Sequence, residues 1–361
     1  MTSDGLNRTG KPCMRVSRYL ALALVSIAWA NAGRSQSPTP TPGPTPAAQP
    51  GRSLRDACAE PVPGDEAAID AARRQLYETL CTATLWLDGL FGHRGSAVAA
   101  REATGRVEVS ALRSPAQGTK VRTALDVDVS LPHLQEKVNA FLGRDSREDY
   151  IRARREGFGL RSQFVGLERD EDWLAGIGYS PVRQPGQRID FRVGASAGRQ
   201  PRVFAQGLYQ RDLKPSESDM WTLREVPFWR SREGFGFTSS ADYDHVLNDA
   251  ALLRWGTVGT VSQGFSGLDW RSAVAVFHRL DPVRAMAYEA FLRGETGTGV
   301  RLGEYGARVV YRQSIFRSWL FAEALLGYSW LQLTPEEPRR GSITMGLGME
   351  LDFGRGYSRT R

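Results

Sequence analysis

The sequence predicts an all-β protein, an antiparallel transmembrane β-barrel of about fourteen strands preceded by a short periplasmic helix. Twelve strands are the alternative count. The first observation is the C-terminal segment 342–353, which alternates apolar and polar residues as a strand with two different faces does. The second is that segments with the same period of two recur from residue 105 onward, separated by turn signals. The third is an export signal at the N-terminus.

The first 32 residues have the organisation of a secretory signal peptide. Arg15 and Arg18 precede an apolar run, 19–30, and small residues follow as far as Ala32. This run is too short to span a membrane, and no run of about 20 apolar residues exists elsewhere, which excludes a transmembrane helix. An exported chain with barrel strands is expected in the outer membrane of a Gram-negative bacterium.

The predicted organisation has five parts. They are a signal peptide over 1–32 with Met14 as an alternative start, a linker over 33–57, a periplasmic helical segment over 58–104, the barrel over 105–354 and a tail over 355–361. The linker repeats Thr-Pro steps, which favour a semi-rigid extended spacer. Apolar residues at helical spacing predict a helix over 66–88. We expect it to cap the periplasmic mouth of the barrel, with a plug or a docking element as alternatives.

Two cysteines remain after the signal peptide is removed. Cys58 and Cys81 form an even pair in an oxidising compartment, which predicts a disulfide. Two unpaired small apolar residues are the alternative. A bridge across this loop would stabilise the fold by about 3 kcal/mol.

Charged residues fall mostly on the polar side of the predicted strands. We expect them to line the lumen as ion pairs of mixed sign, whereas on a soluble β-sandwich they would face bulk water. The predicted lumen charges are Arg122, Asp126, Asp128, Asp190, Arg192, Arg224, Arg254, Arg271, Glu289, Arg308, Arg312, Glu323 and Glu350.

The last strand is expected to close the barrel by pairing with residues 105–113. Its markers are Thr344, Gly346, Met349, Leu351 and Phe353. If both ends of the barrel are periplasmic, the surface connections are short. The one long connection, 132–156, then falls on the periplasmic side, and the alternating pattern predicts a strand over 157–169.

The sequence identifies no catalytic residue, cofactor site or metal site. Gly194 to Gly198 matches the G-x-S-x-G pattern, but a second strand follows it in place of the helix that a nucleophile elbow requires. Ser272 and His278 share one face of a strand, roughly 20 Å apart at about 3.3 Å per residue, which is too far for a nucleophile and its base. The four histidines have no metal-ligand spacing.

Several stretches are similar to a known group of proteins. They are LNDAALLR at 247–254, RSWLFAE at 317–323, GLGMELDFG at 346–354 and WLDGLFG at 86–92. With these stretches the chain resembles a group of uncharacterised proteobacterial outer-membrane β-barrel proteins. The resemblance implies a barrel of this type and carries over no catalytic residue.

The sequence therefore predicts an outer-membrane barrel, either structural or a narrow passive pore with a charged lumen. A lipid- or lipopolysaccharide-modifying enzyme is one alternative. A barrel that recruits a periplasmic assembly or trafficking partner through residues 66–92 is the other. The expected partners are outer-membrane lipid, lipopolysaccharide and the insertion machinery. Nucleic acid is not expected, because the chain is exported and its net charge of +7 is scattered.

Overall fold

The computed structural model describes residues 59, 67–91, 104–131, 137–144, 158–164, 173–197 and 201–354. The predicted signal peptide, linker and C-terminal tail lie outside these residues. No helix in the described part of the chain is long and apolar enough to span a membrane.

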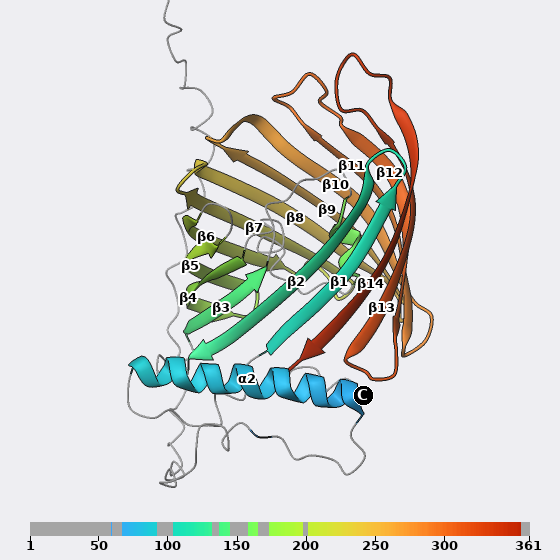
Figure 1. The fold of residues 1–361 in the computed structure, drawn as a ribbon. Coiled ribbons are helices and arrows are strands. Elements are labelled where there is room, and N and C mark those ends of the chain that lie inside the picture. The colour runs from blue at the N-terminus through green and yellow to red at the C-terminus, as the bar shows by residue number, and fades with distance from the viewer. Residues whose placement is uncertain are drawn as a thin grey trace, which may run out of the picture. The chain divides into compact units, whose positions relative to one another are not determined.

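Fourteen antiparallel strands form one closed barrel, in which each strand pairs with its sequence neighbours and β14 pairs with β1 (Figure 1). The strands are β1 (Thr104–Ser114), β2 (Gly118–Leu131), β3 (Val138–Arg144), β4 (Trp173–Gln184), β5 (Gln187–Ala197), β6 (Arg202–Leu213), β7 (Asp219–Arg230), β8 (Gly234–Asn248), β9 (Ala251–Ser262), β10 (Phe265–Arg279), β11 (Arg284–Glu295), β12 (Glu304–Ser314), β13 (Leu320–Leu331) and β14 (Arg340–Phe353). The predicted fold and the count of fourteen are confirmed.

The closing strand β14 pairs with β1 from Phe353, opposite Gly105, to Met345, opposite Arg113. The ring of Phe353 is fully buried and lies directly over Gly105, where an added Cβ would be 2.0 Å from the ring. Thr344, Gly346, Met349 and Leu351 lie in the same strand. The absence of a side chain at residue 105 therefore makes room for the last aromatic residue of the seam.

The two faces of the barrel are inverted relative to a soluble protein. On β14 the outward Met345 and Leu347 are 58% and 69% exposed, whereas the inward Glu350 is 2% exposed. An apolar exterior and a charged interior are favourable only where lipid surrounds the barrel, since a closed ring satisfies every strand edge without water. The protein is an outer-membrane β-barrel.

One helix, α2 (Ala68–Phe91), precedes the barrel and contacts it at the rim where β14 ends. Leu76 packs against the buried cluster of Val127, Val129 and Phe353. In addition, Arg317 in the turn between β12 and β13 donates from Nη2 to Asp70 Oδ2 at 2.7 Å. We call this end of the barrel the inner rim, because both ends of the barrel chain lie there, and the opposite end the outer rim.

Two predictions about the first third of the barrel are wrong. Residues 157–169 do not form a strand, because the described part, 158–164, contains the 3₁₀ helix η2 (Gly159–Ser162). Within the predicted long connection, 132–156, the structure instead contains β3, which pairs with β2 and β4. The two errors cancel in the strand count but change the position of the long connection.

The long connection joins β3 to β4 and spans residues 145–172. β2 runs from the turn at 115–117, at the outer rim, to the inner rim. The antiparallel strand β3 therefore runs back, and its C-terminal end lies on the side of the outer rim. The expectation of a long connection on the periplasmic side is therefore incorrect. This long connection supplies the segment that enters the barrel.

Candidate functional site: a charged lumen narrowed by an inserted segment

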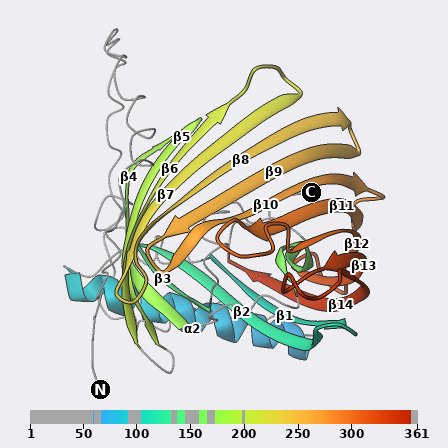
Figure 2. The ribbon, with the colours of Figure 1, turned by 90° about the horizontal axis from the view of Figure 1, so that it is seen from above.

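Residues Phe158–Phe164, which we call the lumen segment, lie inside the barrel against the wall formed by β10–β14 and β1. Figure 2, seen along the barrel, shows this short green segment within the ring and next to β12–β14. The segment begins at Phe158, whose φ of 72° is left-handed, and continues through η2. A non-glycine residue in this region turns the chain out of an extended path, so the alternation in this stretch does not produce a strand.

Apolar side chains hold the lumen segment on the wall. Leu160 is 1% exposed and packs with Leu112, Val310 and Leu325, which point inward from β1, β12 and β13. Phe158 contacts Phe277 of β10, with 5.6 Å between ring centroids. At the other end of the segment, the cavity lined by Gln163, Phe164 and Leu112 has a volume of about 20 Å³, room for about one water molecule. The interface between segment and wall is therefore close-packed.

A carboxylate on the wall binds the backbone of the segment. Glu323 of β13 accepts hydrogen bonds from the backbone N–H groups of Gly159 and Leu160, at 3.1 and 2.9 Å. Arg312 of β12 donates to Glu323 at 2.5 Å and to Glu350 of β14 at 2.8 Å. One arginine thus links the carboxylate that holds the segment to the closing strand.

The second ionic contact involves Arg161 of the segment. Its Nε donates to Glu289 Oε2 at 2.6 Å, and Arg308 Nε donates to the other oxygen of the same carboxylate at 2.8 Å. The three side chains are all less than 10% exposed. Arg308 also donates to the backbone carbonyls of Arg161 and Gln163. A buried charge needs a partner, so each member of this group depends on the others.

The end of the segment contacts β1 and β11. Gln163 donates through Nε2 to Glu108 at 2.5 Å and accepts from the Ser110 hydroxyl at 2.9 Å. Phe164 meets Phe291 edge to face at 5.1 Å, and the Arg308 guanidinium lies 4.4 Å from the Phe164 ring centre. The segment is thereby fixed at both of its ends as well as through η2.

The opposite wall, β2–β9, carries ion pairs of which some members remain partly exposed. Asp128 and Arg192 lie 3.8 Å apart, with side chains 32% and 21% exposed. Arg224 donates to Asp242 at 2.5 Å, and the Asp242 side chain is 22% exposed. By comparison, Glu289 is only 3% exposed beneath the lumen segment. On the opposite wall Arg224 and Asp190 are as buried as Glu289. Asp128, Arg192 and Asp242, in contrast, keep charged groups in contact with solvent.

The predicted lumen charges divide between these walls. Glu289, Arg308, Arg312, Glu323 and Glu350 gather beneath the lumen segment, whereas Asp128, Asp190, Arg192, Arg224 and Arg254 form pairs on the other wall. Arg271 lies 5.8 Å from the Phe164 ring centre, Arg122 is buried on β2 and Asp126 is exposed.

Sequence reasoning missed Arg161, Gln163 and Glu108. A usable signal was present, because apolar residues such as Leu112 and Val310 occupy the inward side of strands whose other inward residues are polar. Apolar groups facing a lumen indicate that something packs on them.

The outward face offers no nucleophile next to a base among the described residues. The hydroxyl of Ser272 accepts from Trp255 Nε1 at 3.0 Å, and His278 lies six positions further along the same strand. The pattern at Gly194 to Gly198 begins in β5, which ends at Ala197. Asp219 and His245, 2.8 Å apart at the inner rim, form the one histidine–carboxylate contact of the described chain. No metal-binding cluster occurs in the ranges that the structure describes.

The predicted disulfide remains a prediction. Cys81 lies on α2 and is fully buried, whereas Cys58 lies outside the described residues.

Comparison of the sequence with protein-family models and with curated proteins finds no match. Solved structures similar to this chain include a KdgM porin in complex with disordered oligogalacturonate, with TM-score 0.35, 5% identity and 69% of this chain and 99% of that chain covered. A bacterial polysaccharide outer membrane secretin has TM-score 0.41 and 12% identity, covering 70% and 99%. OmpT of Vibrio cholerae has TM-score 0.38 and 9% identity, covering 70% and 96%.

Proposed function

We propose that this protein is a narrow outer-membrane channel whose lumen is constricted by the segment Phe158–Phe164. The observation that carries the proposal is the difference between the two walls of the lumen. The segment packs on one wall and buries Glu289 and Arg308, whereas Asp128, Arg192 and Asp242 on the other keep between 21% and 32% of their side chains exposed. A water-filled path along β2–β9 accounts for both observations.

The size of the barrel supports this proposal. About eight strands enclose an interior that side chains alone can fill, and sixteen or more leave an aqueous channel. A barrel of fourteen strands encloses a lumen wider than wall side chains alone fill, so a narrow channel needs additional protein inside it. Among the residues that the structure describes, the lumen segment supplies such material, and it lies against one side of the barrel.

The charges of the lumen indicate the selectivity that we expect. Arginines and carboxylates alternate around the open wall, as in the pairs Arg192–Asp128 and Arg224–Asp242. Because the two signs are interspersed, neither small cations nor small anions meet a single-sign barrier. We therefore expect weak charge selectivity among small ions.

Single-channel recording in planar bilayers tests the proposal. The purified chain, shown to be folded by its heat-modifiable migration on gels, should produce small and uniform conductance steps in potassium chloride. Reversal potentials under a salt gradient should indicate a permeability ratio near one. A folded preparation that gives no steps at any voltage would contradict the channel and leave a structural role.

A further inference from the structure

Two cavities adjoin each other on the wall formed by β10–β14, one on its lipid-facing side and one at its rim, where residues of both faces of the wall line it. The first is an apolar groove of about 690 Å³ at the middle of the wall, and the second is a rim cavity of about 500 Å³ at the outer rim. Tyr328 and Ile343 line both of them. Together they form a continuous surface that runs from the membrane-spanning part of the wall to the outer rim.

The apolar groove exists because small side chains lie between large ones. Ala290 of β11 is paired with Ala307 of β12, and both face outward. In the next row the pair is Tyr288 and Val309, so the wall is raised on the side of the inner rim. The groove is therefore a shape in the wall itself and does not depend on any loop.

Aromatic side chains border the groove on the side of the outer rim. Tyr305 stacks on Trp330 at 5.3 Å, and Tyr328 meets Trp330 edge to face at 4.8 Å. The Tyr328 hydroxyl extends over Gly341, where an added Cβ would lie 2.1 Å from it. Aromatic rings of this kind mark the level at which hydrocarbon gives way to headgroups. The rim cavity thus lies at headgroup level.

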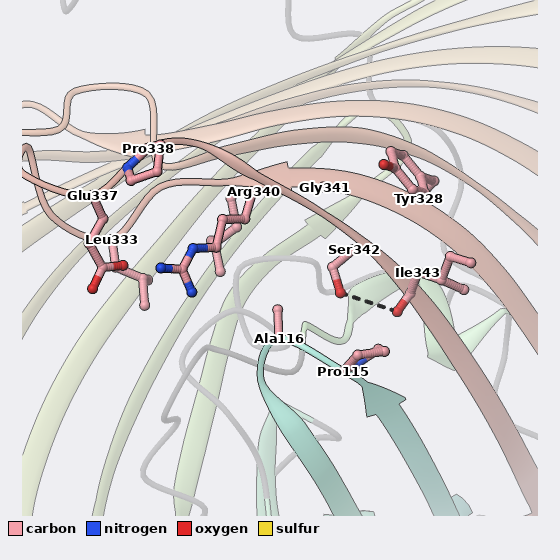
Figure 3. A pocket seen from close by; sticks show the side chains of 11 residues that line it. Pro115, Ala116, Tyr328, Leu333, Glu337, Pro338, Arg340, Gly341, Ser342 and Ile343 are labelled. Carbon is pink, nitrogen blue, oxygen red and sulfur yellow. Dashed lines mark hydrogen bonds between the residues drawn. The ribbon is translucent and has the colours of Figure 1, made fainter.

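The rim cavity opens where two hairpins differ in length. The pairing of β1 with β14 ends at Arg113 and Met345, whereas β14 continues to Arg340 in its pairing with β13. Figure 3 shows Pro115 and Ala116 of the shorter hairpin facing Ser342 and Ile343 across this space.

Arginines occupy the rim cavity and its border. Arg340 lines the cavity, is exposed, and has no ion pair with the residues that the structure describes. Its neighbour Arg339 donates to the Leu302 carbonyl at 2.7 Å, and its guanidinium lies 5.0 Å from the Tyr305 ring centre. Among the described residues that line this cavity, Glu337 is the one that carries a carboxylate. Figure 3 shows Arg340 and Glu337 on the same side of the cavity.

We propose that this surface binds a phosphorylated lipid of the outer leaflet, with an acyl chain in the groove between Tyr288 and Tyr328 and a phosphate at Arg340. The hydrocarbon around the wall favours an acyl chain as the occupant of an apolar groove. A guanidinium at headgroup level recognises phosphate through charge-assisted hydrogen bonds. The groove lies on the lipid-facing side, and Arg340 lines the rim cavity from the row of β14 that pairs with Leu331, next to the outward Tyr328 and Ile343.

Native mass spectrometry of the full chain released from detergent micelles tests the site, with hexa-acylated lipid A bisphosphate as the probe. Wild-type protein should retain one lipid A molecule at concentrations where dioleoyl phosphatidylglycerol is not retained. The variant A290L/A307L fills the groove and should weaken retention by at least about tenfold. Ala241→Leu, an outward alanine on β8, is the matched control and should retain lipid A like the wild type.

Two charge variants test the headgroup contact. Arg340→Gln should weaken retention about tenfold, as expected for one charge-assisted hydrogen bond, and Glu337→Gln should strengthen it. Equal retention of phosphatidylglycerol, or the same loss in Ala241→Leu, would overturn the proposal. So would an oligomer that A290L/A307L dissociates, because the groove would then belong to a second copy of this chain.

Discussion

Arg161 on the lumen segment and Arg308 on the barrel wall share one carboxylate, that of Glu289, at 2.6 and 2.8 Å. All three side chains are buried. Without the segment, Glu289 and Arg308 would face the lumen as an ordinary wall pair. The buried acid between two arginines therefore couples the position of the segment to the charge pattern of β11 and β12.

Removing the charge of Glu289 should destabilise the barrel. Glu289→Gln leaves two buried arginines without a carboxylate between them, and breaking a buried pair in this way costs about 3 kcal/mol. Urea unfolding in lipid vesicles measures the change. Glu233→Gln, in the turn after β7, is the control, because its pair with Arg230 is partly exposed on both sides and should contribute about 1 kcal/mol or less. Equal effects of the two variants would show that burial beneath the segment adds nothing to the stabilisation by the Glu289 carboxylate.

A larger side chain at Gly348 should displace the lumen segment. An added Cβ at this position already lies 3.4 Å from Leu160, so a leucine has no room while the segment is in place. A Ser162→Cys reporter, buried in the wild type, should react with a charged maleimide much faster when combined with Gly348→Leu. Gly256→Leu, on the opposite wall beside Asp242, is the matched control and should leave the reporter slow. A fast reporter in the otherwise wild-type chain would contradict the close packing.

The contact of α2 with the inner rim should weaken in acid. The hydrogen bond from Arg317 holds the pKa of Asp70 below its ordinary value of 3.8. Because the folded pKa is depressed, the stabilisation is present above pH 3.8 and is lost as the pH falls through the lower, folded pKa. Fluorescence of the tryptophans should report this, since Arg73 lies 5.4 Å from the Trp319 ring. In Asp70→Asn the fluorescence should show no such acid transition. If the transition persisted unchanged in this variant, another titrating group would be its cause.

The closing seam should depend on Phe353 and Gly105. Truncating the fully buried Phe353 to alanine should lower the free energy of unfolding by about 3–5 kcal/mol. In Gly105→Ala the barrel should fail to close, because the added Cβ overlaps the Phe353 ring. Loss of the heat-modifiable folded band on gels measures both effects. Met349→Ala on the same strand, 49% exposed to lipid, should keep the folded band.

The sequence was sufficient to predict the barrel and the two faces of its strands, because both follow from a period of two. The partners of individual charges depend on strand register, which a single sequence does not determine. Arg312, for example, was expected to face the lumen, but its link from Glu323 to Glu350 needs the pairing of β12, β13 and β14.

The sequence predicts a strand over 157–169 and misses β3, and this error also has a physical cause. In residues 158–164, the apolar residues Phe158, Leu160 and Phe164 lie at even positions, which imitates a strand with a lipid-facing side. Here they pack on the wall from within. Conversely, β3 places Phe141 inward against Phe204 and Arg192, so its apolar residues lie on both faces and the alternation is weak.

Single-channel conductance shows directly whether the lumen segment narrows the pore, when the folded wild type is compared with a folded variant in which residues 158–164 are replaced by seven glycine and serine residues. If the segment constricts a water-filled lumen, the variant should conduct several-fold more current per channel than the wild type at the same salt concentration and voltage. An unchanged conductance, or no conductance in either folded protein, would contradict the account.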